Sequence, residues 1–529
     1  MKPDLRIGSR HNRVLVIHIG SKFQVSTRIR FMTTPVKVIG AVFCLLLAPS
    51  LGGCDSGASA LRDVIDTLIG NGYSLSKEGD RELARFRKVY NEHLAGSAGG
   101  EQFRHFSDAF KRVRINYVRE VADARLIDTA IKGVRDLKAK AQSAKPDKLV
   151  ESALDSMLTS LDPHSTYLNA DEYRDMQMST KGVFGGLGLE VTMENGLVKV
   201  VSPIENTPAF KAGLKPGDVI THLDGRPIKG HTLSWAVKRM RGRPGAAIRL
   251  TVKRSARAPF VVTIVRAIIQ VPAMRWRVAG EIGYIRVTRF NEHAEKNLLN
   301  AMEEIRGQLG RRLKGLILDL RNNPGGLFEQ SWVIADAFLE EGRIVSVKGR
   351  DAGGMRVYKA KPGDLAQGLP IVLLINGGSA SASEIVAGAL QDHNRAIVLG
   401  RRSFGKGSVQ TITPLPVEGA LRLTTQLFYT PSGRAIQAQG VIPDISLTVP
   451  ETEVAKKLRR EADLPGALPG ARRTLVAQQM RPRASLPESA CPADRERGGE
   501  DRPLGCAMAF LNAGSTQKFL ALIKSRPQI

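Results

Sequence analysis

Two short segments in the second half of this chain have residue types that could together carry out nucleophilic chemistry. Residues 376–385 read NGGSASASEI, and residues 401–410 read RRSFGKGSVQ. A serine is a weak nucleophile until a nearby base removes its proton, and a neutral lysine can be that base. Lys406 stands between two glycines, so the two segments predict a serine activated by a lysine. This chemistry requires that burial lower the lysine pKa from its reference value of about 10.4.

Each segment also has a plainer interpretation. A serine-rich run is typical of a helix N-cap, and Gly-Lys-Gly is typical of a turn. The second segment is only a weak match to a phosphate-binding loop, because Gly407 stands where GxxxxGK[ST] requires Ser or Thr. Spacing alone leaves Ser379, Ser381 and Ser383 open as alternative nucleophiles.

The elements around these segments favour an α/β core. From residue 282 onward, apolar runs of strand length alternate with helical patterns. The predicted strands cover 284–287, 316–320, 371–375 and 396–399, and the predicted helices cover 294–309, 328–339 and 382–391. A turn between a buried strand and a helix exposes side chains at the strand end, where open α/β sheets have their sites. The helix also directs its first N–H groups at a developing oxyanion.

Residues 182–266 have a different, β-rich pattern. The predicted elements are strands at 187–191, 198–201, 219–223, 248–252 and 261–265 and a helix near 233–240. They indicate a compact, partly open barrel. Residues 184–189 read FGGLGL and residues 212–218 read AGLKPGD, which together look like a PDZ domain. Successive N–H groups of a Gly-rich loop can capture a terminal carboxylate while the bound peptide adds a strand to the sheet edge.

These motifs resemble the carboxyl-terminal processing peptidases, a serine protease family of bacteria and chloroplasts. The likeness rests on LDLRNNPGG at 318–326, the serine-rich segment, FGKG at 404–407 and the PDZ motifs, and it covers about residues 100–450. The turn at 158–168 and the run at 433–444 match the family as well. The resemblance implies a multi-domain α/β fold: an α/β protease core with an inserted PDZ domain and a helical N-terminal region.

The resemblance assigns roles that spacing alone leaves open. It implies that Ser381 is the nucleophile, that Lys406 is the general base and that Gln410 orients the lysine. Glu384 and Asp392 match positions that support the structure of the site.

The resemblance also implies two sets of backbone donors. The oxyanion hole would use the N–H of Ala382 and that of Gly325 or Gly326, because glycine lets the backbone approach a substrate closely. The carboxylate of a bound peptide would meet the loop of Gly185, Gly186, Leu187 and Gly188. By contrast His164, after Asp-Pro, is more typical of a turn or packing residue than of a catalytic base.

The beginning of the chain predicts export. From Met32, an alternative start, a short basic region precedes the apolar residues 38–48, and Leu-Gly-Gly-Cys follows. This run is shorter than the about 20 residues that span a bilayer, but it suits a signal peptide. Leu-Gly-Gly-Cys resembles a lipobox that would place a lipid anchor on Cys54, and Asp55 resembles an inner-membrane retention signal. The alternative is ordinary cleavage and release.

Composition narrows the range of partners. The 529 residues include 78 Lys and Arg against 51 Asp and Glu, for a formal net charge of +27. Because the basic residues are spread along the chain without interleaved aromatic residues, we do not expect nucleic-acid binding. Cys491 and Cys506 form an even pair for an oxidising compartment, although spacing does not establish that they are bonded. No Cys/His cluster has metal-ligand spacing, so we expect neither a metal nor another cofactor.

Together these patterns predict an endopeptidase of the periplasm or cell envelope, anchored to the inner membrane, that cleaves envelope proteins near their carboxyl termini. Protein substrates bound by those termini would be its partners, with an adaptor or homo-oligomer as a further expectation. The alternatives are a non-catalytic PDZ scaffold of the envelope and a hydrolase of other substrates. The expected parts are an upstream extension with signal peptide at 1–53, a linker and helix-prone region at 54–100, a helical region at 101–181, a PDZ domain at 182–266, the catalytic core at 267–450 and a poorly ordered extension at 451–529.

Overall fold

The computed structural model describes residues 75–94, 99–140, 145–204, 206–255, 257–350, 354–449, 459–470, 482–494 and 500–525. The predictions about Met32, the signal peptide, the Cys54 anchor and Asp55 lie outside these residues. Within the described ranges, no helix is both long enough and apolar enough to cross a membrane.

Within the described residues, four helices pack around one apolar core in the N-terminal region. They are α3 (Lys77–Glu92), α4 (Gly100–Asn116), α5 (Asp123–Lys140) and α6 (Pro146–Thr159). Apolar residues spaced three and four apart turn one face of each helix inward. Phe106 of α4 is buried in this way, and Phe86 of α3 stacks on it with 3.7 Å between ring centroids. The helical region therefore includes α3, which lies within residues 54–100, predicted as a linker and helix-prone region.

An antiparallel sheet connects this region to the core. Its strand order is β1-β18-β13-β14, with β17 also paired to β18. The elements are β1 (Thr166–Leu168), β13 (Arg343–Lys348), β14 (Arg356–Lys359), β17 (Ser408–Pro414) and β18 (Ala420–Tyr429), and α7 (Ala170–Thr180) follows β1. β18 pairs with β1 on one side and with β17 on the other. The turn that precedes β1 therefore lies close to β18.

The PDZ-like domain has the predicted strands and helix. Its main sheet has the order β3-β4-β5-β7-β8, with β6 beside β5, and β2 pairs separately with β9. The elements are β2 (Val183–Gly186), β3 (Leu189–Glu194), β4 (Leu197–Pro203), α8 (Pro208–Lys211), β5 (Val219–Leu223), β6 (Arg226–Pro227), α9 (Leu233–Met240), β7 (Ala247–Lys253), β8 (Phe260–Val265) and β9 (Ala267–Gln270). Since β9 pairs with β2, the domain extends to Gln270, beyond the predicted end at residue 266.

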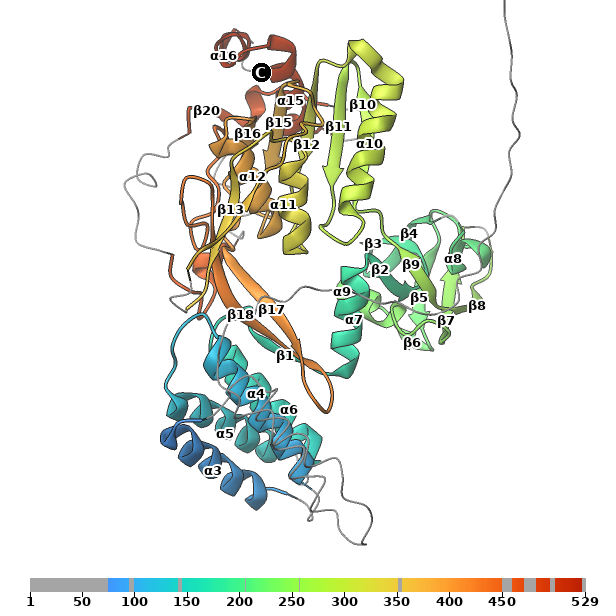
Figure 1. Cartoon of the computed structure of the whole chain (residues 1–529). Helices are drawn as coiled ribbons and strands as arrows, with labels where there is room; N and C mark the ends of the chain where they lie inside the picture. The colour runs from blue at the N-terminus through green and yellow to red at the C-terminus, as the bar shows by residue number, and fades with distance from the viewer. Residues whose placement is uncertain are drawn as a thin grey trace, which may run out of the picture. The chain divides into compact units, whose positions relative to one another are not determined.

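The core is a seven-stranded sheet of order β10-β11-β12-β15-β16-β19-β20 (Figure 1). All neighbours are parallel except β10, which is antiparallel to β11. The strands are β10 (Met274–Ala279), β11 (Ile282–Val287), β12 (Gly315–Asp319), β15 (Ile371–Ile375), β16 (Ala396–Gly400), β19 (Ile445–Thr448) and β20 (Ala484–Pro487). Every residue of β12 and β15 is buried, as expected for parallel strands that are covered on both faces.

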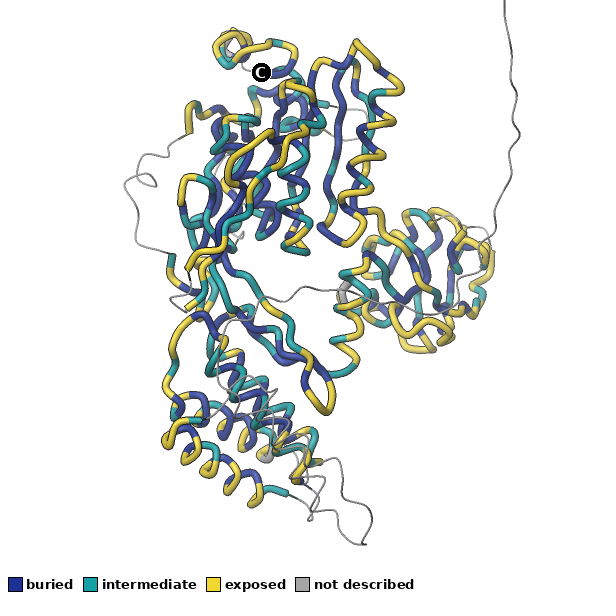
Figure 2. The backbone as a smooth tube through the Cα atoms, viewed as in Figure 1, coloured by how far each residue is buried: buried dark blue, intermediate teal, exposed yellow. Residues whose placement is uncertain are grey.

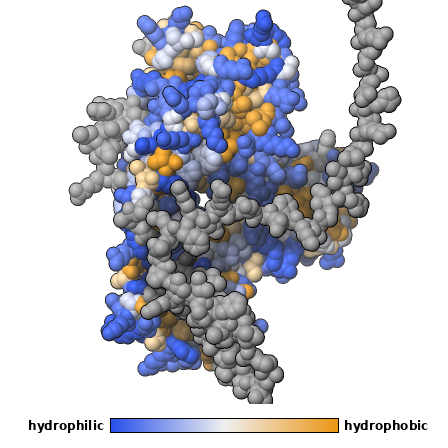
Figure 3. All heavy atoms as spheres, viewed as in Figure 1, coloured by the Kyte–Doolittle hydropathy of each residue, from blue (hydrophilic) through white to orange (hydrophobic). Residues whose placement is uncertain are grey.

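Alternate residues of these strands face two separate apolar clusters. One cluster contains side chains of α10 (Ala294–Leu309), which η1 (Gly310–Arg312) follows, of α11 (Phe328–Asp336) and of α12 (Ala382–Asp392). The other contains side chains of α15 (Arg502–Ala513) and α16 (Thr516–Lys524). Figure 2 shows the buried strands between more exposed helices, and on the face drawn in Figure 3 most of the surface is hydrophilic, with smaller apolar patches.

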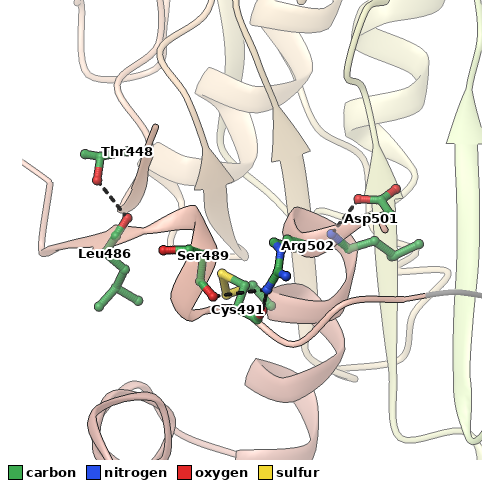
Figure 4. The surroundings of a disulfide bond; sticks show 8 residues. Thr448, Leu486, Ser489, Cys491, Asp501 and Arg502 are labelled. Carbon is green, nitrogen blue, oxygen red and sulfur yellow. Dashed lines mark hydrogen bonds between the residues drawn. A yellow bond between two sulfur atoms is a disulfide. The ribbon is translucent and has the colours of Figure 1, made fainter. Parts of the chain in front are cut away.

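The prediction of a poorly ordered extension after residue 450 is wrong for its described parts. β20 extends the sheet beside β19, and α15 and α16 cover the second apolar face. Cys491, which follows η3 (Glu488–Ala490), and Cys506 are bonded, and Arg502 donates to the Cys491 carbonyl at 3.0 Å (Figure 4). The charged, proline-rich composition concealed these elements. Their apolar residues pack against strands of the sheet that lie far away in the sequence, so no local pattern indicates them.

Candidate active site

Ser381 lies where the chain turns from β15 into α12. It is the N-cap of α12 and has φ +56° and ψ −113°, a backbone conformation that residues with a Cβ rarely adopt. Such strain persists where the surroundings enforce it, often at functional sites. Ser381 is partly exposed and lines a cavity of about 580 Å³ together with Lys406 and Gln410.

The other two candidate serines are committed to backbone contacts. Ser379 Oγ donates to the Leu320 carbonyl at 2.8 Å, and Ser383 Oγ donates to the Asn323 carbonyl at 3.0 Å. Both side chains are fully buried. These bonds hold the serine-rich turn against the loop after β12. Because the first and third serines are buried in this way, Ser381 is the serine of the three that faces the cavity.

Lys406 lies in the loop between β16 and β17, and its Nζ donates to Gln410 Oε1 at 2.6 Å. Burial, helped by the positive charge of Arg422, lowers the pKa of Lys406 to about 8, although the carboxylates of Glu461, Asp162 and Glu384 act in the opposite direction. With that pKa, about a tenth of the lysine is neutral at pH 7. The loop therefore supplies a usable base near neutral pH.

Gln410 is held in one orientation by a hydrogen-bond chain. Its Nε2 donates to Ser408 Oγ at 3.0 Å and to Thr424 Oγ1 at 3.2 Å, and Thr424 Oγ1 donates to Asp162 Oδ1 at 3.0 Å. The amide oxygen consequently faces Lys406, which has N–H groups to donate. Sequence reasoning missed Thr424 and Asp162; for Asp162 the signal available was the match of the turn at 158–168 to the family.

Glu384 joins the two loops of the site. Its Oε2 accepts from the N–H of Ser381 at 2.8 Å and of Lys406 at 2.9 Å, and its Oε1 accepts from Ser403 Oγ at 2.5 Å and from the Gly405 N–H at 2.7 Å. Burial raises the pKa of this carboxyl to about 7, against the four hydrogen bonds, which lower it. This is the supporting role that the resemblance implied.

Asp392, the other residue with an implied supporting role, lies at the far end of α12. It forms an ion pair with Arg434 and accepts from the Ser432 N–H at 2.9 Å. It thus holds the turn that follows β18, at a distance along the helix from Ser381.

The two glycines proposed for the oxyanion hole differ in their surroundings. The Gly325 N–H already donates to Asn323 Oδ1 at 2.9 Å. Among the described residues, no acceptor is found for the N–H of Gly326 or of Ala382, and both residues line the cavity beside Ser381. A Cβ on Gly325 would lie 2.9 Å from Ser381 Cβ and 3.0 Å from the Ala382 nitrogen, so glycine is required for this close approach.

His164 does not line this cavity. Its backbone N–H donates to Asp162 Oδ1 at 2.8 Å, as in a turn, and its Nε2 lies 2.8 and 3.0 Å from the two carboxylate oxygens of Glu461. Among the described residues, no group of His, Cys, Asp or Glu side chains could hold a metal ion.

The Gly-rich loop of the PDZ-like domain lies beside an edge strand. Gly185 and Gly186 belong to β2, and Leu187 and Gly188 connect it to β3, whose other edge is unpaired in the described sheet. The Leu187 carbonyl accepts from the Ala209 N–H and the Gly188 carbonyl from the Ile204 N–H. Within the described part of the chain, no acceptor is found for the N–H groups of Leu187 and Gly188.

Comparison with known proteins identifies the family. The model of peptidase family S41 matches residues 281–447, and the PDZ domain model matches residues 185–259. A carboxy-terminal-processing protease of Bartonella bacilliformis is 50% identical over 358 residues, which cover 67% of this chain and 77% of that protein. The chain belongs to the carboxy-terminal-processing proteases of family S41. It is a serine-type peptidase, and its predicted fold of an α/β core, a PDZ domain and a helical region is confirmed.

Two further proteins are similar to this chain at lower sequence identity. A probable CtpA-like serine protease of Staphylococcus aureus is 34% identical over 347 residues, or 65% of this chain and 68% of the relative. Among solved structures, the photosystem II D1 C-terminal processing protease is 28% identical, with 66% of this chain and 93% of that chain covered and a TM-score of 0.42.

Replacing Glu384 by Gln should strongly lower the activity of this protease. Whichever way the new amide turns, its NH₂ group faces two donors that the carboxylate accepted, and each unsatisfied buried donor costs about 1–3 kcal/mol. We expect kcat/KM for a peptide substrate to fall about 100-fold, the equivalent of about 3 kcal/mol. Glu303→Gln, an exposed change on α10, is the control. Unchanged peptide hydrolysis by Glu384→Gln would show that the carboxylate does not hold the site together.

Proposed function

We propose that this protease is an endopeptidase that binds the carboxyl-terminal segment of a protein through its PDZ domain and cleaves near it, with Ser381 as nucleophile and Lys406 as general base. The observation that supports it best is that Ser381, Lys406 and Gln410 line one cavity while Glu384 accepts from the backbone of both Ser381 and Lys406. A non-catalytic scaffold is not favoured, because the chain belongs to a peptidase family.

In the proposed reaction, neutral Lys406 takes the proton of Ser381 Oγ as the oxygen attacks the substrate carbonyl. The N–H groups of Ala382 and Gly326 donate to the oxyanion that forms. The lysine then gives its proton to the leaving amine, and a water molecule hydrolyses the acyl-enzyme by the reverse proton path. Gln410 keeps Nζ in place through both steps.

One part of the cavity lining is apolar and suits an apolar substrate side chain, whereas Arg289, Glu329 and Arg356 make another part of it charged. Side chains with large apolar surfaces reach the same cavity as Ser381, namely Phe328, Tyr358, Ile385 and Phe428. An apolar substrate side chain gains free energy on leaving water for such surroundings, whereas a charged one would lose hydration.

The envelope location is part of the proposal. The bonded Cys491 and Cys506, a pairing that the sequence left open, support folding in an oxidising compartment. Envelope proteins would then be the substrates, and Cys54 would carry the anchor.

The pair of catalytic residues predicts both a loss of activity and a pH dependence. Ser381→Ala and Lys406→Ala should fold but not hydrolyse a peptide substrate. In the unaltered enzyme kcat/KM should rise with pH through a midpoint near the Lys406 pKa of about 8, because the base must be neutral. Rates measured across about pH 6 to 10 would test this. Activity retained by either variant, or a flat profile, would contradict the assignment.

Carboxylate capture by the PDZ domain predicts that binding depends on a free terminus. With Ser381→Ala, which binds without turnover, a peptide with a free carboxylate should bind at least about tenfold more tightly than its carboxamide. Gly188→Ala should abolish this difference, because its Cβ would lie 2.2 Å from Thr207 at a φ of +79°. Gly307→Ala, whose Cβ meets nothing within 4 Å, is the matched control. Equal affinity for both peptides would refute carboxylate capture.

The anchor predicts a fractionation result. Expressed in a bacterium, the full chain should pellet with membranes and incorporate labelled fatty acid, because lipidation of Cys54 adds an acyl anchor. Cys54→Ser should remove the label and release protein to the soluble fraction. If the unaltered chain takes up no label, the signal is simply cleaved and the anchor does not exist.

A further inference from the structure

The segment 459–470 places a carboxylate behind the loop of Lys406. It follows the region matched by the peptidase family model, which ends at residue 447, and contains η2 (Glu461–Asp463). Glu461 is fully buried. A buried carboxylate is costly unless donors surround it, so its partners show what the segment is built to hold.

The partners of Glu461 come from distant parts of the chain. His164 Nε2 lies 2.8 and 3.0 Å from its two oxygens, across 297 residues of sequence. Gln437 Nε2 donates to Oε1 at 2.9 Å and also to the Leu468 carbonyl at 3.1 Å. Leu468 is in turn part of the apolar core of the helical N-terminal region. The segment therefore connects that region to the catalytic core.

The same residues hold the backbone on both sides of Lys406. The Glu461 N–H donates to the Phe404 carbonyl at 3.1 Å. On the other side, the Gly407 N–H donates to Gln437 Oε1 at 2.9 Å. Glu384 of α12 accepts from the N–H groups of Gly405 and Lys406, whereas Glu461 and Gln437 bind the flanking residues Phe404 and Gly407.

We propose that Glu461 is a positioning residue that fixes the loop of Lys406 through Phe404, Gln437 and His164. Catalysis then depends on segment 459–470 of this chain being packed against that loop. The inference rests on the proposed role of Lys406 as general base.

The charges around Lys406 come from four elements. Glu384 is on α12, Arg422 is on β18, Asp162 is in the turn between α6 and β1, and Glu461 is in η2. Arg422 lowers the pKa of Lys406, and the carboxylates raise it. Removing the charge of Glu461 alone should therefore lower the pKa of the lysine further. This effect separates a residue whose charge acts on Lys406 from one that only stabilises the fold.

The test compares Glu461→Gln with Asp463→Asn, an exposed residue of the same short helix whose carboxylate accepts from the Arg460 N–H. For Glu461→Gln we expect kcat to fall about tenfold with KM within about twofold, and the acid limb of the kcat profile to move to lower pH. Asp463→Asn should change neither quantity. The position of the limb does not depend on how much enzyme is folded, so a stability loss alone cannot mimic it. An unchanged kcat and an unmoved limb in Glu461→Gln would overturn the proposal.

A double-mutant cycle with His164→Gln tests the connection to the helical region. If His164 acts through Glu461, the double variant should lose less activity than the product of the two single losses. Independent, multiplying losses would exclude this link.

Lys406→Ala is measured in parallel. Its retained activity would refute the general base itself, whereas an inactive Lys406→Ala with a normal Glu461→Gln would refute only the positioning role.

Discussion

One buried carboxylate, that of Glu384, sets the geometry on which the rest of the site depends. Taking a carboxylate out of water costs several kcal/mol, and only well-placed donors offset that cost. Two of its four donors are the N–H groups of Ser381 and Lys406, so the same interaction that satisfies the charge also brings together the loops that carry these two residues. Its place in the first turn of α12 adds the favourable end of the helix dipole. The strained backbone of Ser381 is held within this arrangement.

The sheet topology explains why three loops can meet there. β12, β15 and β16 are adjacent and parallel, so their carboxyl ends lie at one edge of the sheet. The loop after β12 carries Gly325 and Gly326, the loop after β15 carries Ser381, and the loop after β16 carries Lys406. Ser379 and Ser383 bind the first two loops to each other through backbone carbonyls, and Glu384 binds the second to the third. The order of the strands thus places these three loops together at the carboxyl edge of the sheet.

The hydrophobic pattern within single segments was sufficient to predict many of the helices and strands. β15, α9 and α10 have the predicted bounds, because a continuous apolar run or an amphipathic period is written within the segment itself. The serine-rich turn and Lys406 were visible in the same way, although choosing Ser381 required the family resemblance. Thr424 and Glu461 could not be found, since their site contacts join residues 262 and 297 positions apart. The same reason applies to α15 and α16, whose apolar faces have meaning only against a sheet that the local sequence does not show.

The long-range contacts also explain how Lys406 can have a lowered pKa although three carboxylates act on it. A free carboxylate beside Nζ would form an ion pair and keep the lysine protonated. Here each acid is already engaged: Asp162 accepts from the N–H groups of His164 and Ser165 and from two hydroxyls, Glu461 from His164 and Gln437, and Glu384 from its four donors. Nζ instead donates to the neutral amide of Gln410. Burial and Arg422 can then outweigh these three negative charges, so the lowered pKa depends on which donors the acids bind as much as on where Lys406 lies.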